Sequence, residues 1–187
     1  MEIPIIEILG ATIGLVYIFL EYRASCWLWI AGIVMSLFYI YIWAEVNCYA
    51  WALTYLYYLG ANIYGIIAWK KHSANEAESI ISNLPKKKYP LLIFISLIAT
   101  ALMFFLLRRY TDSHIPFSEA FSTALSVVGM WLLAKKYLQH WYVWLVVNAI
   151  YAIANVWMGL YFSAFLFTVY FGVSVLGLVR WRKLAGE

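Results

Sequence analysis

The chain has 187 residues, of which 66% are apolar and only 12% are charged. A soluble domain is about half apolar and about a quarter charged, so this excess cannot be buried in one small core and the expected solvent is lipid. The formal net charge of +4 does not indicate nucleic acid, because the basic residues gather in loops between apolar spans rather than along one face. Two cysteines, Cys26 and Cys48, are too few for a disulfide framework.

Seven apolar spans of 17 to 21 residues are predicted as membrane helices. Each is long enough for a hydrocarbon core of about 30 Å at a rise of about 1.5 Å per residue, and an unpaired backbone in lipid is too costly for other conformations. The start of the chain lacks a basic n-region and a cleavage site, so we expect it to form the first span rather than a removed signal peptide. The spans cover residues 3–20, 26–43, 49–69, 91–107, 117–133, 141–158 and 160–179.

The sequence repeats itself, because residues 7–71 align with residues 119–183 at a constant offset of 112 without a gap. This register gives 13 identities over 65 positions, and they are mostly Trp, Tyr, Gly and Glu, as in Trp29/Trp141 and Gly65/Gly177. Duplicated membrane bundles with a central site are a recurring transporter design.

The expected fold is an all-α membrane protein with two three-helix repeats and one linking helix. Repeat 1 takes residues 1–72, the cytoplasmic loop and linking span take residues 73–114, and repeat 2 takes residues 115–187. Three spans reverse the direction of the chain and the fourth restores it, so we expect parallel repeats related by an axis along the membrane normal. The expected ligand site lies on that axis, where the repeats meet.

Lysine and arginine are shared unevenly between the two ends of the spans, with 2 on the N-terminal side and 11 on the other. The positive-inside rule therefore places the N-terminus outside and the C-terminus in the cytoplasm. The polar segment 70–90, which contains Lys86-Lys87-Lys88, becomes the main cytoplasmic loop. We interpret it as a solvated linker attracted to anionic lipid, with a regulatory or partner site as the alternative.

Motifs that would indicate an enzyme are absent from the sequence. It contains no P-loop, no His/Cys/Asp cluster with metal spacing and no G-x-S-x-G motif. Its three histidines, His72, His114 and His140, lie in predicted loops or at interfaces. We therefore expect no enzyme, no metal site and no cofactor.

Polar side chains within the sixth span form the sharpest candidate site. Asn148 and Asn155 are seven residues apart and share one helix face, with Tyr151 between them and Trp144 four residues earlier. This stripe is interpreted as a ligand wall, and hydrogen bonding between helices is the alternative that the residues leave open. Ser36 is the residue equivalent to Asn148 in repeat 1.

Repeat 1 offers a matching aromatic wall on its third span. Trp51, Tyr55, Tyr58 and Asn62 are spaced by four, three and four residues, and Tyr39 joins them from the second span. Aromatic faces stack on flat heterocycles and attract cations, while asparagine both donates and accepts hydrogen bonds. The wall is interpreted as a ligand surface or as packing.

Two glutamates occupy equivalent positions near the starts of the first and fifth spans. Glu7 and Glu119 complement the macrodipole at a helix N-terminus. The alternative is that they attract a cationic solute at the external mouth.

These residues together resemble the PnuC-type vitamin transporters, which import nicotinamide riboside, and their PnuT relatives, which import thiamine. The resemblance rests on the segments at residues 7–25, on Tyr64-Gly65 with Trp69, on Trp144 with Val147-Asn148, and on Gly177 with Trp181 and Lys183. It implies a fold like an enlarged SWEET transporter and facilitated diffusion of an unphosphorylated vitamin in a bacterial cytoplasmic membrane. It also implies a cytoplasmic kinase that traps the product. Family binding residues would correspond to Trp144, Asn148 and the face of the third span.

One departure from the family pattern favours thiamine as the substrate. The third span of nicotinamide riboside members often begins Tyr-Ala-Asp, with Gln or Asn four residues beyond, whereas this chain has Tyr49-Ala50-Trp51 and Tyr55. A ribose needs polar partners for its hydroxyls, so these aromatic residues suit a less hydroxylated cation. Nicotinamide riboside is the alternative substrate, and a non-transporting scaffold or complex subunit is the alternative function. Small and aromatic residues on every span are also compatible with a homo-oligomer.

Overall fold

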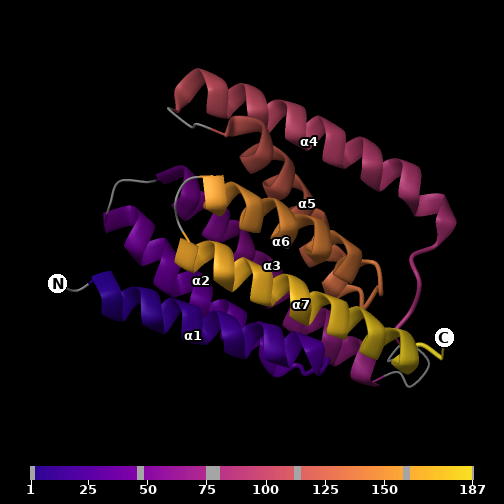
Figure 1. Cartoon of the computed structure of the whole chain (residues 1–187). Helices are drawn as coiled ribbons and strands as arrows, with labels where there is room; N and C mark the ends of the chain where they lie inside the picture. The colour runs from indigo at the N-terminus through magenta and orange to yellow at the C-terminus, as the bar shows by residue number, and fades with distance from the viewer. Residues whose placement is uncertain (1–2, 46–48, 75–80, 112–114, 158–160, 187) are drawn as a thin grey trace. The chain divides into compact units, whose positions relative to one another are not determined.

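The computed structural model describes residues 3–45, 49–74, 81–111, 115–157 and 161–186, and these ranges contain seven α-helices (Figure 1). The expected all-α architecture is therefore confirmed, and each predicted span corresponds to one helix. The helices are α1 (Ile3–Tyr22), α2 (Trp27–Glu45), α3 (Tyr49–Ala74), α4 (Tyr89–Tyr110), α5 (Pro116–Ala134), α6 (His140–Trp157) and α7 (Tyr161–Leu184).

Several helices extend past the apolar spans that predicted them. α3 continues through Lys70 to Ala74, and α7 continues to Leu184, because a helix keeps its backbone hydrogen bonds where its side chains become polar. Within the described residues, length and composition alone would let Lys86–Tyr110, Pro116–Ala134 and Ala164–Leu184 cross a membrane. The stretches Thr12–Tyr22, Trp27–Phe38 and His140–Ala154 are apolar but shorter.

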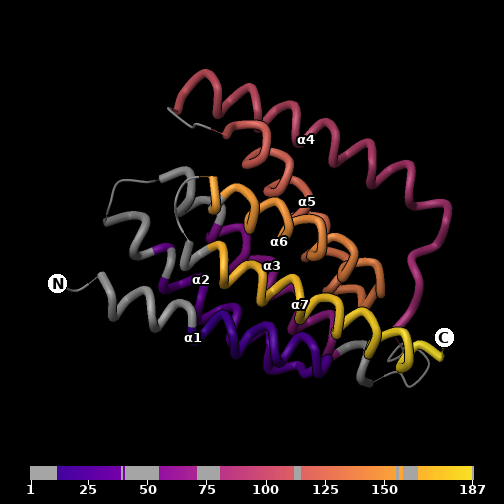
Figure 2. The backbone as a smooth tube through the Cα atoms, in the orientation of Figure 1, coloured from indigo at the N-terminus to yellow at the C-terminus, as the bar shows by residue number. Residues whose placement is uncertain are grey.

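The chain divides into two compact units, Met1–Ile80 (unit 1) and Ile81–Glu187 (unit 2). In unit 1, α2 packs against both α1 and α3. In unit 2, each helix from α4 to α7 packs against the next one along the chain, and the backbones of α6 and α7 run side by side (Figure 2). The three-part division at residues 72 and 114 stays a prediction.

The turn that follows the first helix of each repeat has the same hydrogen bonds in both units. In unit 1, Ala24 N–H donates to Glu21 O at 2.9 Å and Ser25 N–H to Leu20 O at 3.0 Å. The equivalent bonds in unit 2, 112 residues later, are Lys136 N–H to Leu133 O and Tyr137 N–H to Leu132 O, both at 2.9 Å. This pair of bonds is a Schellman motif, so the repeat extends to the caps of the helices.

Ala24 and Lys136 both have the left-handed conformation that the Schellman motif requires. Their φ angles are 52° and 54°, a region that costs a residue with a Cβ about 1–2 kcal/mol. Glycine is the usual residue at this position, and neither repeat has it. The same strained conformation is therefore present twice.

A tryptophan packed on a glycine joins the second and third helices of each repeat. A Cβ added to Gly65 of α3 would overlap the ring of Trp29 of α2, and one added to Gly177 of α7 would overlap the ring of Trp141 of α6. Small residues allow such close approach between membrane helices. Trp29 packs edge-on against Trp69 with 5.5 Å between ring centroids, and the equivalent pair, Trp141 and Trp181, is separated by 5.9 Å.

The prediction that residues 70–90 form a solvated linker is wrong for residues 81–84, whereas Lys86, Lys87 and Lys88 are exposed as that interpretation expects. Ile81 and Leu84 are buried, and Ser82 forms backbone hydrogen bonds with the turn between α5 and α6. Residues 75–80 lie outside the described part of the chain. The segment 81–84 is therefore part of the packed structure of unit 2.

We expect Ala24→Gly to stabilise the protein by about 0.5–1 kcal/mol, because glycine has no steric penalty at positive φ, although it loses more backbone entropy on folding. Thermal unfolding in detergent measures the change. Ala101 is exposed on α4, and Ala101→Gly is the matched control, which should destabilise by about 1 kcal/mol. If Ala24→Gly lowered the melting temperature as much as the control, the strain at residue 24 would be contradicted.

Candidate functional site

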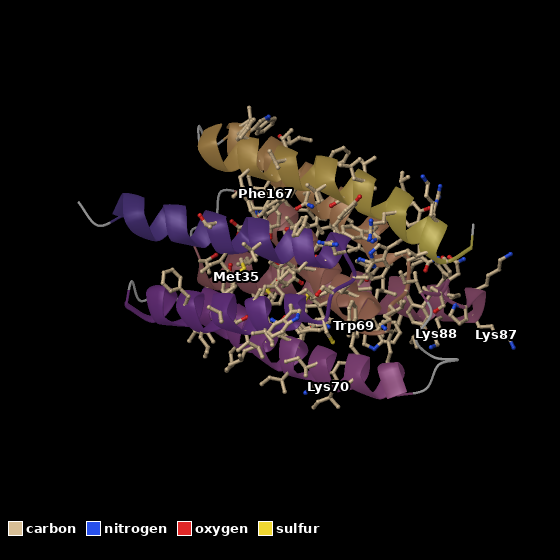
Figure 3. The ribbon with its side chains drawn as sticks, turned by 90° about the horizontal axis from the view of Figure 1, so that it is seen from below. Met35, Trp69, Lys70, Lys87, Lys88 and Phe167 are labelled. Atoms are coloured by element: carbon tan, nitrogen blue, oxygen red, sulfur yellow. The ribbon has the colours of Figure 1, made fainter. Side chains whose placement is uncertain are left out.

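The predicted stripe on α6 contacts the helices on both sides of it. The ring of Trp144 lies beside Gly129 of α5, where an added Cβ would be 3.5 Å from Trp144 Cζ2. Tyr151 stacks on Phe167 of α7 with 4.8 Å between ring centroids and an interplanar angle of 26°. Figure 3 labels Phe167 on α7. One face of α6 therefore carries aromatic contacts to α5 and to α7.

Asn148 forms a hydrogen bond to α7. Its Nδ2 donates to Ser174 Oγ at 3.2 Å, and Ser174 Oγ in turn donates to Tyr170 O at 2.8 Å. Asn148 is buried, with 6% of its surface exposed. The interhelical hydrogen bond that the sequence left open is thus present, and a ligand role for Asn148 stays a prediction.

Asn62 of α3 has the same kind of partner in unit 1. Its Nδ2 donates to Tyr58 O at 2.7 Å and lies 3.4 Å from Ser36 Oγ of α2. A Cβ added to Gly32 would overlap the Asn62 amide, so this amide occupies the space above a glycine. Asn62 Oδ1 is buried and accepts no hydrogen bond from the described residues.

Asparagine and serine occupy opposite helices of the pair in the two units. The asparagine lies on α3 and the serine on α2 in unit 1, whereas in unit 2 the asparagine lies on α6 and the serine on α7. The residue equivalent to Gly32 is Trp144. Because a tryptophan leaves no room for an amide from the facing helix, unit 2 has serine at position 174 and the amide at position 148.

Tyr55 and Tyr58 are the two aromatic side chains of the wall in unit 1 that the structure describes. Their rings meet edge to face at 5.6 Å between centroids, and both side chains are half-buried. The remaining candidates have side chains outside the described residues, and their roles stay predictions: Tyr39, Trp51, Asn155 and Glu7.

Glu119 is in the first turn of α5, as expected for a residue that complements the helix dipole. Its N–H donates to Ile115 O at 3.1 Å, which closes the first turn. Attraction of a cationic solute by Glu119 stays a prediction.

Glu21 is a buried acid that the sequence analysis missed. The first span was predicted to end at residue 20, but α1 continues to Tyr22 and leaves the Glu21 side chain only 1% exposed. Tyr17 lies one turn earlier on the same helix. The repeat register carried the signal, because the equivalent residue in unit 2 is Leu133, which is fully buried.

The chemistry of these side chains suits binding rather than catalysis. Aromatic rings offer faces for a flat heterocycle, and amides offer donors and acceptors. The Nε1–H of Trp144 is buried and donates to no acceptor among the described residues. Within the same part of the chain, no group of three His, Cys, Asp or Glu side chains could hold a metal ion.

Comparisons with known proteins agree with this fold. A family model described as nicotinamide mononucleotide transporter matches residues 4–183. The nicotinamide riboside transporter PnuC of Escherichia coli is 26% identical over 160 residues, which cover 72% of this chain and 67% of that protein. The riboflavin/roseoflavin transporter RibM of Streptomyces davaonensis is 22% identical over 182 residues, which cover 94% of this chain and 83% of that protein.

A solved structure shares the architecture. The crystal structure of the vitamin B3 transporter PnuC has a TM-score of 0.72 and 20% sequence identity to this chain, and the match covers 95% of this chain and 80% of that one. The expected fold of seven membrane helices is therefore confirmed.

We expect Gly32→Ala to destabilise the protein by about 1–3 kcal/mol, because the added methyl group must displace the buried Asn62 amide and its hydrogen bonds. Asn62→Ser removes the amide and should recover much of that loss in the double variant. Melting temperatures of the two single variants and the double variant give the coupling energy.

Gly60→Ala is the matched control, because an added Cβ there meets nothing within 4 Å. It should leave the melting temperature unchanged or raise it. Additive effects of Gly32→Ala and Asn62→Ser would contradict the contact between these residues.

Proposed function

This chain belongs to the nicotinamide mononucleotide transporter family, and we propose that it carries a small unphosphorylated vitamin across a membrane. The observation that carries the proposal is the family match over residues 4–183. The structure supports it with two helix faces that combine aromatic rings and amides. The chain is not an enzyme, as the sequence predicted.

Nicotinamide riboside is the substrate we favour. The names of the relatives point to a nicotinamide riboside or riboflavin carrier, and they support the alternative from the sequence better than thiamine, its first choice. A nicotinamide ring is flat and cationic and suits stacking on Tyr55, Tyr58 or Trp144. Its carboxamide suits Asn148, and the Trp144 Nε1–H is a donor for a carbonyl or hydroxyl oxygen.

Thiamine is the alternative within the same family. It is supported by Trp51 and Tyr55, which stand where polar residues would serve a ribose. Tyr55 packs edge-on against Tyr58. This packing is sufficient to explain an aromatic residue at position 55 without a change of substrate. The names of the relatives therefore outweigh this argument.

The mechanism we propose is facilitated diffusion followed by trapping. The predicted spans contain no Asp, Lys, Arg or His deep in the membrane to relay protons. A phosphate added by a cytoplasmic kinase would prevent the product from returning. We place the protein in a bacterial cytoplasmic membrane, and the excess of basic residues on one side supports an orientation with the N-terminus outside.

We expect nicotinamide riboside to raise the melting temperature of the purified protein more than thiamine or riboflavin does. A solute at about 100 times its Kd stabilises by about 2.7 kcal/mol, and nicotinamide mononucleotide is the phosphorylated control. Uptake into proteoliposomes then separates carriers from other binding proteins. A larger shift with thiamine would select the alternative substrate, and no uptake of any vitamin would leave the non-transporting scaffold.

Asn148→Ala should weaken binding of the favoured vitamin by about 1–3 kcal/mol, because a buried polar group on the solute loses its partner. Ser174→Ala is the matched control, since it removes the same interhelical hydrogen bond but keeps the amide. It should leave Kd within about threefold, or roughly 0.7 kcal/mol. Calorimetry on both variants decides the question, and equal losses would mean that Asn148 acts through packing alone.

A further inference from the structure

The segment before α4 is joined to the turn between α5 and α6 by a short parallel bridge. Ser82 N–H donates to Lys136 O at 3.1 Å, and Leu138 N–H donates to Ser82 O at 2.9 Å. Leu84 is buried and packs with Val128 and Leu132 of α5. The bridge therefore attaches the loop that precedes α4 to the loop between α5 and α6.

The side chain of Gln139, in the turn between α5 and α6, adds two hydrogen bonds to this bridge. Its Oε1 accepts the N–H of Leu84 at 2.7 Å, and its Nε2 donates to Asn83 Oδ1 at 2.7 Å. One amide thus closes two hydrogen bonds between the loops. We call residues 81–88 together with 135–139 the clamp.

The clamp brings two separate lysine runs to the same end of unit 2. Lys88 Nζ lies 3.2 Å from the Tyr137 hydroxyl and 5.6 Å from the centroid of Trp131, so its position is fixed by cation–π contacts. Lys86 and Lys87 are exposed, and Figure 3 shows Lys87 extending away from the ribbon. Lys135 and Lys136 come from the other loop.

The charged residues that the structure describes at this end of unit 2 all have the same sign. The described residues at the starts of α4 and α6 and at the ends of α5 and α7 include no Asp or Glu. They do include a set of basic residues: Lys86, Lys87, Lys88, Lys135, Lys136, Arg180, Arg182 and Lys183. This end of the unit therefore has the electrostatic character of an anion site.

The helix beside these lysines exposes apolar side chains. On α4, only Ser96 and Thr100 are buried, whereas Leu91, Phe94 and Leu97 are more than half exposed at 59%, 61% and 59%. A soluble anion would use only the charges, but a phospholipid would use the charges for its headgroup and the apolar face for its acyl chains.

We propose that the clamp and the first turns of α4 form a binding site for anionic phospholipids. Lys86 and Lys87 contact the headgroup phosphate, and the acyl chains lie along the outer face of α4. The clamp holds the loop in place before the lipid binds. Binding therefore does not have to order this loop, and less conformational entropy is lost. Polybasic segments next to a membrane helix attract anionic lipid in this way.

The test compares lipids on the full-length purified protein. We expect phosphatidylglycerol to raise the melting temperature more than phosphatidylcholine, and native mass spectrometry should retain the anionic lipid. Replacing Lys86 and Lys87 with glutamine should weaken retention by about fivefold per lysine. Replacing Arg108 and Arg109 with glutamine removes the same charge from the opposite end of α4 and should leave retention unchanged.

Two further variants test the clamp without changing any charge. Gln139→Ala removes both hydrogen bonds and should weaken retention of phosphatidylglycerol, while Asn83→Ala, at an exposed residue, should have a smaller effect. Equal stabilisation by both lipids, or equal losses in the lysine and arginine variants, would overturn the site. Inorganic phosphate that reproduced the stabilisation would replace the lipid with a soluble anion, and wild-type retention in Gln139→Ala would overturn the role of the clamp.

Discussion

Close contact between a tryptophan and a glycine sets the distance between the paired helices in both units. Lipid tails are as apolar as the helices, so membrane helices gain little hydrophobic energy from association and depend on van der Waals packing. Trp29 on Gly65 and Trp141 on Gly177 provide that packing at equivalent positions. Edge-to-face partners such as Trp69 add about 0.5–1.5 kcal/mol per pair beyond the buried area.

This contact also fixes the register of the facing helices, and the candidate site depends on that register. Once the helices meet at Trp141 and Gly177, Asn148 lies opposite Ser174, and Tyr151 lies opposite Phe167. Asn148 and Tyr151, which are proposed to bind the solute, therefore also contact the facing helix. A solute that bonded Asn148 would compete with or extend an interaction that already exists in the protein.

Periodicity and the repeat register predicted the helices, because each apolar span is long and the two copies support one another. The partners of Asn148 and Asn62 could not be predicted, since they depend on the relative rotation of two helices, which spacing along one helix does not contain. Glu21 was missed because a hydropathy boundary ends at the first charge, although the helix continues. The packed loop at Ser82 was missed because amino-acid composition does not indicate backbone hydrogen bonds between segments that are distant in the sequence.

Asparagine and serine lie on opposite helices in the two units. Helices could therefore be exchanged between the units only as matched pairs and not singly. A chimaera that exchanged α2 with α6 would put asparagine opposite asparagine at residue 62 and serine opposite serine at residue 174. It would also bring a tryptophan to the place of Gly32, where the Asn62 amide now lies. Grafting α2 with α3, or α6 with α7, as intact pairs would keep each set of matched side chains. Single helices of the two units are therefore not interchangeable, whereas the matched pairs keep their contacts.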